Sequence, residues 1–225
     1  MKYMYINLDR SPERNERVRR DLQTYFPRYT FDRIRAIDGQ QWPDDIIKHP
    51  AGNPGVNGCF ASHIICMQKL IDDPMESHAI VLEDDVSMEY VKYWQQYHWD
   101  LFNHGTTECD ILQLGCVGPY HGSITHLETK QKQQWSTVAY MITKDAARKI
   151  VSMVTSLHEN KKYDLSRVEN PHADNIIYSL VNTKILPMFT HTRESFSYVT
   201  ESNVRENKKY ETWRQHVENK WTYLG

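Results

Sequence analysis

Apolar and polar residues follow two different periods along the chain, and the pattern predicts an α/β domain. Helical spacing of apolar positions predicts helices at 12–25, 58–71, 87–97, 144–155 and 173–182. Short apolar runs predict strands at 3–8, 29–37, 79–85, 110–114, 136–143 and 184–188. Polar stretches at 40–57, 117–134 and 158–171 read as loops. Because strands and helices alternate, we expect one sheet flanked by helices.

One strand ends abruptly in three acids, Glu83, Asp84 and Asp85. In an extended chain, residues two apart point the same way, so Glu83 and Asp85 share one side and Asp84 takes the other. Adjacent carboxylates repel one another unless a cation or hydrogen-bond donors compensate them. A hard divalent ion, shared with phosphate oxygens, is a common solution. A solvated acidic turn explains the triplet equally well at this point.

The first strand and helix resemble the opening of a nucleotide-binding unit. Pro12 fits the first helical position and Ser11 fits the N-cap before it. A helix N-terminus in this place favours an anion, and Arg10 and Arg14 lie close enough to assist. Asp38 follows the second predicted strand, where an acid can bind a ribose, although an ordinary turn residue is an equal alternative.

Composition limits the function classes more than it identifies one. The 225 residues suit one sizeable domain. With 27 basic and 29 acidic residues, the net charge of −2 gives no reason to expect nucleic acid as a partner. No apolar run approaches the roughly 18 residues of a membrane span, and no signal peptide is evident. The simplest expected location is therefore cytoplasmic, with a membrane-bound acceptor met at the surface by peripheral contact. The four cysteines contain no C-x-x-C pair, and we expect all four to be reduced.

Six separated motifs then agree with one family. They are Ile6–Arg14, Ala36–Gly39, Gly58–His63, Val81–Val86, Leu112–Gly115 and Ala139–Ala147. In this order and spacing the chain resembles the family 25 glycosyltransferases, which include lipopolysaccharide and collagen galactosyltransferases. The similarity covers roughly residues 1–190 and fades after His191.

The resemblance implies a GT-A-like fold, a Rossmann-type mixed sheet in a single domain over 1–225. Residues 1–115 would bind the nucleotide-sugar, residues 116–190 the acceptor, and 191–225 would form a tail packed on the domain. It also implies a nucleotide-sugar donor, often UDP-galactose, a divalent ion such as Mn²⁺ (or Mg²⁺), and inversion at the anomeric carbon. The acidic triplet takes the place of the family's D-x-D motif.

Each step of such a reaction has candidate residues. Asp85 with Glu83 would hold the ion, with His191 as a further ligand because several GT-A enzymes use a late histidine there. Asp84 would face the ribose or sugar. The donor-gripping candidates are Asn7, Arg10, Arg14 and Asp38, with Ser62 and His63 matching the family's G-C-x-x-S-H motif beside them. Asp174 is the first candidate for the general base, with an N-cap role equally open, and His172 is the second.

Two rival functions remain open from the sequence. A metal-dependent phosphohydrolase or nucleotidyltransferase also places carboxylates at strand ends. A non-catalytic glycan-binding module could keep the same fold, but it has little reason to retain three adjacent acids. We therefore expect a transferase that moves a hexose, galactose-like, to a glycan acceptor.

Overall fold

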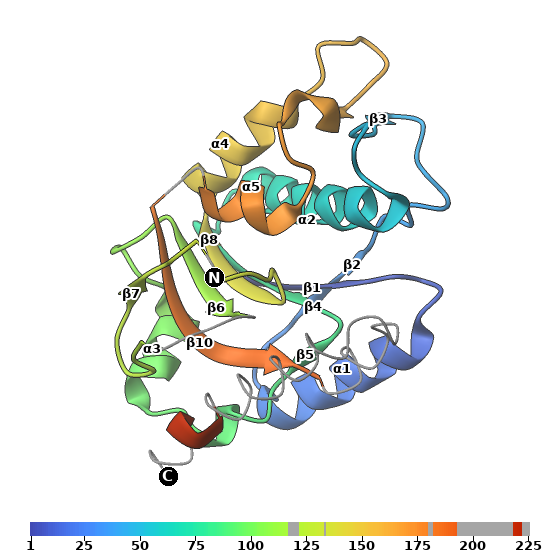
Figure 1. Cartoon of the computed structure of the whole chain (residues 1–225). Helices are drawn as coiled ribbons and strands as arrows, with labels where there is room; N and C mark the ends of the chain where they lie inside the picture. The colour runs from blue at the N-terminus through green and yellow to red at the C-terminus, as the bar shows by residue number, and fades with distance from the viewer. Residues whose placement is uncertain (117–121, 133, 180–181, 193–217, 222–225) are drawn as a thin grey trace, which may run out of the picture.

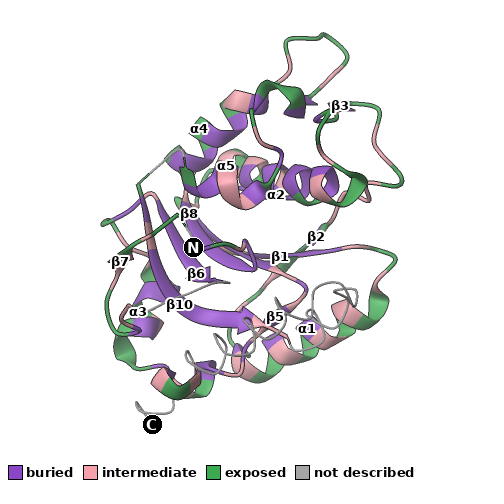
Figure 2. Cartoon of the chain, in the orientation of Figure 1, coloured by how far each residue is buried: buried purple, intermediate pink, exposed green. Residues whose placement is uncertain are grey.

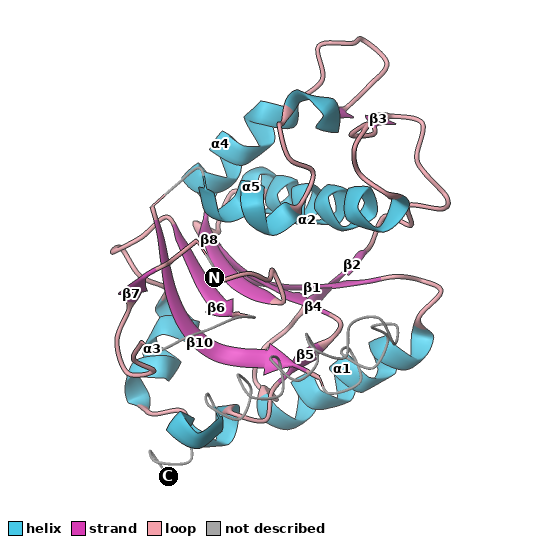
Figure 3. Ribbon diagram, in the orientation of Figure 1, coloured by secondary structure: helices cyan, strands magenta, loops and turns pink. Residues whose placement is uncertain are grey.

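The computed structural model describes residues 1–116, 122–132, 134–179, 182–192 and 218–221. Within them an eight-stranded mixed sheet carries helices on both faces, as Figure 1 and Figure 3 show. Its main path runs β2-β1-β4-β8-β6-β10-β5, and β7 pairs with β10. The expected α/β fold with a mixed sheet flanked by helices is confirmed. No helix in the described ranges has the length and apolar character needed to cross a bilayer.

The sheet consists of strands β1 (Lys2–Asn7), β2 (Asp32–Arg35), β4 (His78–Glu83), β5 (Val86–Ser87), β6 (Ile111–Gly115), β7 (Glu128–Thr129), β8 (Ala139–Thr143) and β10 (Thr183–His191). Strands β3 (Ile46–Ile47) and β9 (Tyr163–Asp164) form a separate two-stranded ladder. The helices are α1 (Pro12–Tyr25), α2 (Pro54–Asp72), α3 (Gln96–His104), α4 (Lys144–Val154) and α5 (Ala173–Ser179), with short 3₁₀ turns at Val91–Tyr93 and Leu165–Arg167.

Strand β4 is buried on both faces because its apolar residues alternate between two cores. Ala79 and Val81 pack in the core under α2 and α4, whereas Ile80 and Leu82 pack in the core with residues of α1 and α3. Figure 2 shows the central strands of the sheet coloured as buried, between the two helical layers. Strand β4 pairs in parallel with β1 and antiparallel with β8. The C-terminal ends of β1, β2 and β4 therefore share one edge of the sheet.

Several boundaries differ from those the sequence pattern predicts. Helix α2 begins at Pro54, four residues before the predicted start, because the Asn53 side chain accepts from Val56 N at 2.9 Å and caps it. The predicted helix 87–97 is wrong: the chain instead forms β5, a 3₁₀ turn and then α3. The apolar residues of that stretch, Met88, Tyr90 and Trp94 among them, are buried in the core as the chain turns. Strand β2 ends before Asp38, which lies in the following turn.

Strand β10 is longer than predicted and extends to His191, at the point where the sequence suggested a tail. Its last residues pair antiparallel with β5, Thr190 with Ser87 and His191 with Val86. The C-terminal tail prediction falls largely on 193–217 and 222–225, which lie outside the described residues. In the described part, Trp221 is fully buried and donates its indole N–H to Pro187 O at 3.2 Å.

Candidate active site

The three acids after β4 diverge to three different sets of partners. The Glu83 carboxylate, on the α2 side, lies 3.2 Å from His63 Nε2 and accepts from the Thr137 hydroxyl at 2.5 Å. Asp84 points to the opposite face, and Asp85 turns toward the end of β10. The triplet is therefore three separate contacts at one sheet edge, divided as the strand alternation predicts for Glu83 and Asp84.

Asp84 is held inside the protein rather than left open at the edge. It accepts from Asn7 Nδ2 at 2.7 Å and from Arg14 Nη1 at 3.0 Å. Burial raises the pKa of Asp84 above its ordinary value, while the Asn7 hydrogen bond and the Arg14 charge act against that rise. The Asn7 oxygen in turn accepts from Arg33. These contacts fix the turn that carries Asp85 against the start of α1.

Asp85 and His191 meet because β5 pairs with the end of β10. His191 Nδ1 lies 3.2 Å from Asp85 Oδ2, and its Nε2 lies 2.7 Å from the Ser136 hydroxyl. The Thr192 amide also donates to the Asp85 carbonyl at 2.8 Å. Burial acts to lower the pKa of His191, but the Asp85 and Glu83 carboxylates outweigh it and leave that pKa above its ordinary value.

Asp174 reaches the same region from the first turn of α5. Its Oδ2 accepts from the Ser136 amide at 3.3 Å, and its side chain is half-buried. Ser136 has a φ of 97°, a left-handed conformation that costs free energy in a non-glycine residue. The Ser136 carbonyl accepts from the Tyr178 hydroxyl at 2.9 Å, which helps to hold that conformation. His172 lies two residues before Asp174 and is exposed.

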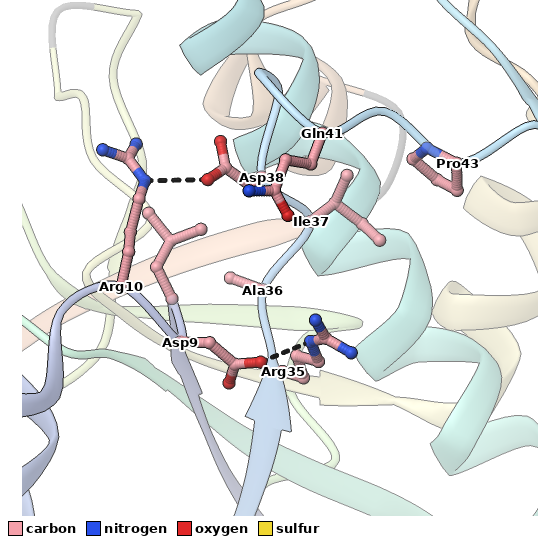
Figure 4. Close-up of a pocket in the computed structure, with 9 residues that line it drawn as sticks. Asp9, Arg10, Arg35, Ala36, Ile37, Asp38, Gln41 and Pro43 are labelled. Carbon is pink, nitrogen blue, oxygen red and sulfur yellow. Dashed lines mark ion pairs between the residues drawn. The ribbon is translucent and has the colours of Figure 1, made fainter.

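A pocket of about 460 Å³ opens beside the ends of β1 and β2 (Figure 4). Its lining includes Arg10 and Asp38, whose side chains form an ion pair at 2.9 Å. Asp9 and Arg35 form a second pair at 2.6 Å on the opposite wall. Asn7 and Arg14 do not line this pocket, because their side chains turn to Asp84.

Ser62 and His63 lie on the buried face of α2 and have different partners. The Ser62 hydroxyl accepts from Ile37 N at 2.8 Å and donates to Gly58 O at 2.6 Å. It therefore ties the helix to the turn that carries Asp38. His63 contacts Tyr140 and Glu83 and lies on the carboxylate side of the site.

Three residues of this region were not among the sequence candidates: Cys59, Ser136 and Thr137. Cys59 precedes His63 by four residues on a predicted helix, so their shared face was a usable signal. Ser136 and Thr137 come beside Glu83 only because β8 pairs antiparallel with β4. That pairing joins segments more than fifty residues apart, and no local pattern reveals it.

Three solved structures have a distant likeness to this chain. The chain has distant structural likeness to A197 from STIV, with 11% identity, coverage of 84% of this chain and 83% of that one, and a TM-score of 0.41. A glycosyltransferase involved in the glycosylation of the major capsid of PBCV-1 has 9% identity, with coverage of 94% of this chain and 100% of that one, and a TM-score of 0.48. The inositol-1-phosphate CTP transferase from T. maritima has 10% identity, with coverage of 93% of this chain and 77% of that one, and a TM-score of 0.37.

No curated protein has a significant sequence match to the chain. The family model of glycosyltransferase family 25, described as an LPS biosynthesis protein, matches residues 1–166. That range contains the β1–α1 opening, the G-C-x-x-S-H helix and the acidic triplet. The chain therefore belongs to glycosyltransferase family 25 and is a glycosyltransferase.

Proposed function

We propose that the protein is a metal-dependent, inverting transferase that moves a galactose-like hexose from a UDP-sugar to a hydroxyl of a glycan. The observation that carries this proposal is the order of groups along one sheet edge. The pocket lies at the ends of β2 and β1, and Asp85 follows the next strand, β4. Neighbouring strands are about 4.7–4.9 Å apart, so β2 and β4, which flank β1, are about 10 Å apart, a span that suits a nucleoside diphosphate.

The pocket has the size and the polar groups expected for the nucleoside part of the donor. Its volume, about 460 Å³, falls within the range of small-molecule sites. Asp38 would accept a hydrogen bond from a ribose hydroxyl. The exposed Arg10, now paired with Asp38, would turn to a phosphate oxygen.

Asp85 and His191 are a suitable donor pair for a divalent ion of the Mn²⁺ type. A carboxylate oxygen and an imidazole nitrogen already lie 3.2 Å apart at the end of the sheet. Such an ion accepts one or two protein ligands when phosphate oxygens and water complete its shell. When bound, it would neutralise the charge that gathers on the leaving diphosphate.

The transfer itself needs a base on the acceptor side, and we assign that role to Asp174. The carboxylate would take the proton from the acceptor hydroxyl while the hydroxyl oxygen bonds to the anomeric carbon. The bond from that carbon to the diphosphate oxygen breaks, and its electron pair leaves with UDP. Attack from the face opposite the leaving group inverts the anomeric centre. The Ser136 amide, just before β8, donates to this carboxylate at 3.3 Å and holds it in place.

A thermal-shift panel tests the donor and the metal together. Sugar conjugates of UDP, GDP, CDP and TDP are added with and without Mn²⁺. A ligand at 100 times its Kd stabilises the fold by about 2.7 kcal/mol, which gives a measurable rise in Tm. We expect a Mn²⁺-dependent rise with UDP-hexose that is lost in Asp85→Asn. If none of the conjugates shifts Tm at millimolar concentration, the proposal is contradicted.

Product analysis separates the transferase from the alternative enzymes. A phosphohydrolase would release phosphate from simple esters without an acceptor, and a nucleotidyltransferase would consume a nucleoside triphosphate. A glycan-binding module would bind sugar but turn over no donor. Acceptor-dependent release of UDP supports the proposed reaction. We keep a cytoplasmic location, and contact with a membrane-bound acceptor at the bilayer surface, as parts of the same proposal.

A further inference from the structure

Helix α2 and strand β4 bring a thiol, an imidazole and a carboxylate together beside the Asp85–His191 pair. Cys59 and His63 are four residues apart and so lie on one face of α2. Glu83 ends β4 directly opposite. The ligand atoms of these three side chains all lie within 4.8 Å of one another. Among the described residues, no other set of three histidine, cysteine or acidic side chains meets this spacing.

Two neighbouring side chains hold these groups in a ligating arrangement. The Tyr140 hydroxyl lies 3.0 Å from His63 Nδ1, which leaves Nε2 facing Glu83 at 3.2 Å. The Thr137 hydroxyl donates to Glu83 Oε1 at 2.5 Å. Metal-binding histidines almost always have such a partner on their second ring nitrogen, and ligating carboxylates are hydrogen-bonded in turn. His63 is 1% exposed, so its orientation is set by packing as well.

We propose that Cys59, His63 and Glu83 form a binding site for a zinc-class transition-metal ion. A thiolate with imidazole and carboxylate selects Zn²⁺ and related ions, whereas Mg²⁺ and Mn²⁺ favour sites dominated by oxygen ligands and without a thiolate. Three protein ligands leave one tetrahedral position open, and the exposed Cys59 lies on the solvent side of the cluster. Water or a substrate oxygen would occupy that position.

This site is distinct from the one proposed for the donor metal. Glu83 turns toward α2, while Asp85 turns toward His191 at the end of β10. The zinc-class ion does not depend on the choice of nucleotide or sugar, so it can be tested even if the proposed donor is wrong.

The required adjustment is small. Tetrahedral Zn²⁺ with bonds of about 2.0–2.3 Å places its ligand atoms roughly 3.3–3.8 Å apart. The His63–Glu83 separation of 3.2 Å already matches. The thiol therefore has to close by at most about 1.5 Å from the 4.8 Å limit of the cluster, a movement that a side-chain rotation supplies at an exposed position.

Cobalt substitution gives a readout that does not depend on activity. Co²⁺ bound to a thiolate produces a near-ultraviolet charge-transfer absorption, which carboxylate or imidazole ligands alone do not give. The full chain is titrated with Co²⁺ and then competed with Zn²⁺. We expect a saturable thiolate band that Zn²⁺ removes. Cys59→Ser should abolish the band and weaken Zn²⁺ binding by more than the roughly 10–100-fold that loss of a supporting hydrogen bond costs.

Matched variants separate this site from other causes. Cys109→Ser also removes one thiol, but it lies just before β6 at the opposite end of the sheet, so the band should remain. Tyr140→Phe removes the hydroxyl that holds His63 and should weaken Zn²⁺ binding by about 10-fold or more. Asp85→Asn should retain the band while it loses the Mn²⁺-dependent response to UDP-hexose.

The result that overturns the proposal is an absence of thiolate absorption, or a band that survives Cys59→Ser with unchanged affinity. Either outcome would make the cluster a His63–Glu83 hydrogen bond beside a passive thiol. Circular dichroism and thermal unfolding of Cys59→Ser check that the exposed substitution leaves the fold intact. If that variant failed to fold, Tyr140→Phe would decide: unchanged Zn²⁺ affinity there also overturns the proposal.

Discussion

At the scale of single residues, Asp84 and Asp85 show that adjacent acids can have opposite roles. Asp84 satisfies the amide of Asn7 and the charge of Arg14 inside the protein. Asp85 lies beside His191 where the sheet edge meets the proposed diphosphate site. We therefore expect the two substitutions to affect different properties of the protein.

Asp84→Ala should destabilise the fold, whereas Asp85→Asn should remove transfer activity with little effect on stability. The first change removes one of the two acceptors of the buried Asn7 amide, which keeps only the Ser11 carbonyl, and an unsatisfied buried N–H costs about 1–3 kcal/mol. The second keeps the shape of the side chain but removes the charge proposed to hold the ion. Urea unfolding and UDP-release rates measure the two effects. An unfolded Asp85→Asn would show that the Asp85 contact serves the structure instead.

Asp174→Asn should reduce kcat by about 10²–10⁴-fold while the Kd for UDP-hexose stays unchanged, because only proton transfer is lost. Isothermal titration gives the Kd, and a coupled UDP assay gives kcat. His172→Gln is the comparison, since this side chain is exposed and close in sequence. A large loss of kcat in His172→Gln with little loss in Asp174→Asn would transfer the base role to His172.

At the scale of elements, the close approach of α2 to the turn after β2 connects the family motif with the pocket. A Cβ on Gly58 would lie 2.6 Å from the Ile37 carbonyl oxygen, and one on Gly39 would lie 1.8 Å from Pro54 O. Both contacts are with backbone atoms, which cannot rotate away. Glycine at these two positions therefore allows the helix to hold the turn that contains Asp38.

Gly58→Ala should lower stability by about 1–3 kcal/mol and weaken UDP-hexose binding, because the added methyl group pushes the turn out of place. Gly55→Ala is the matched control on the same helix. Its Cβ would meet Asn53 Oδ1 at 3.4 Å, so the stability change should stay within about 0.5–1 kcal/mol. Thermal shift with and without the donor measures both properties. Equal behaviour of the two variants would contradict this account.

How much the sequence predicts depends on whether a feature is local. The strand before the acidic triplet and the Pro12 helix start follow from nearby residues, and both are found, although the strand predicted at 79–85 ends at Glu83. The stretch after Asp85 is mispredicted because its apolar spacing suits a helix, while tertiary packing draws Met88 and Tyr90 into the core as the chain turns. Thr137 meets Glu83 and His191 meets Asp85 through long-range pairings, β8 with β4 and β10 with β5, which a single sequence does not encode in any local pattern.

At the scale of the whole molecule, distant parts of the chain complete the site by returning to the same sheet edge. Strand β10 pairs in parallel with β6 and then continues past Pro187 until its end meets β5. The C-terminal segment packs behind this path: Trp221 stacks with Tyr90 at 5.9 Å between ring centroids and lies 4.9 Å from the His98 ring. Trp221 thus supports the strand that supplies His191.

Trp221→Ala should therefore reduce both the stability of the domain and its response to the donor. Loss of this fully buried ring should cost about 3–5 kcal/mol, because the cavity it leaves adds to the lost burial. The Pro187 carbonyl would also lose its indole donor, close to the turn of β10 toward Asp85.

Trp135→Ala is the control, since that ring is 45% exposed and its removal should change stability by less than about 1 kcal/mol. Urea midpoints at constant m separate a stability change from a change in the unfolded state. Equal midpoints for the two tryptophan variants would mean that residues 218–221 are not part of the cooperative fold, and β5 pairing with the Ser136 and Asp85 contacts would then hold His191 without them.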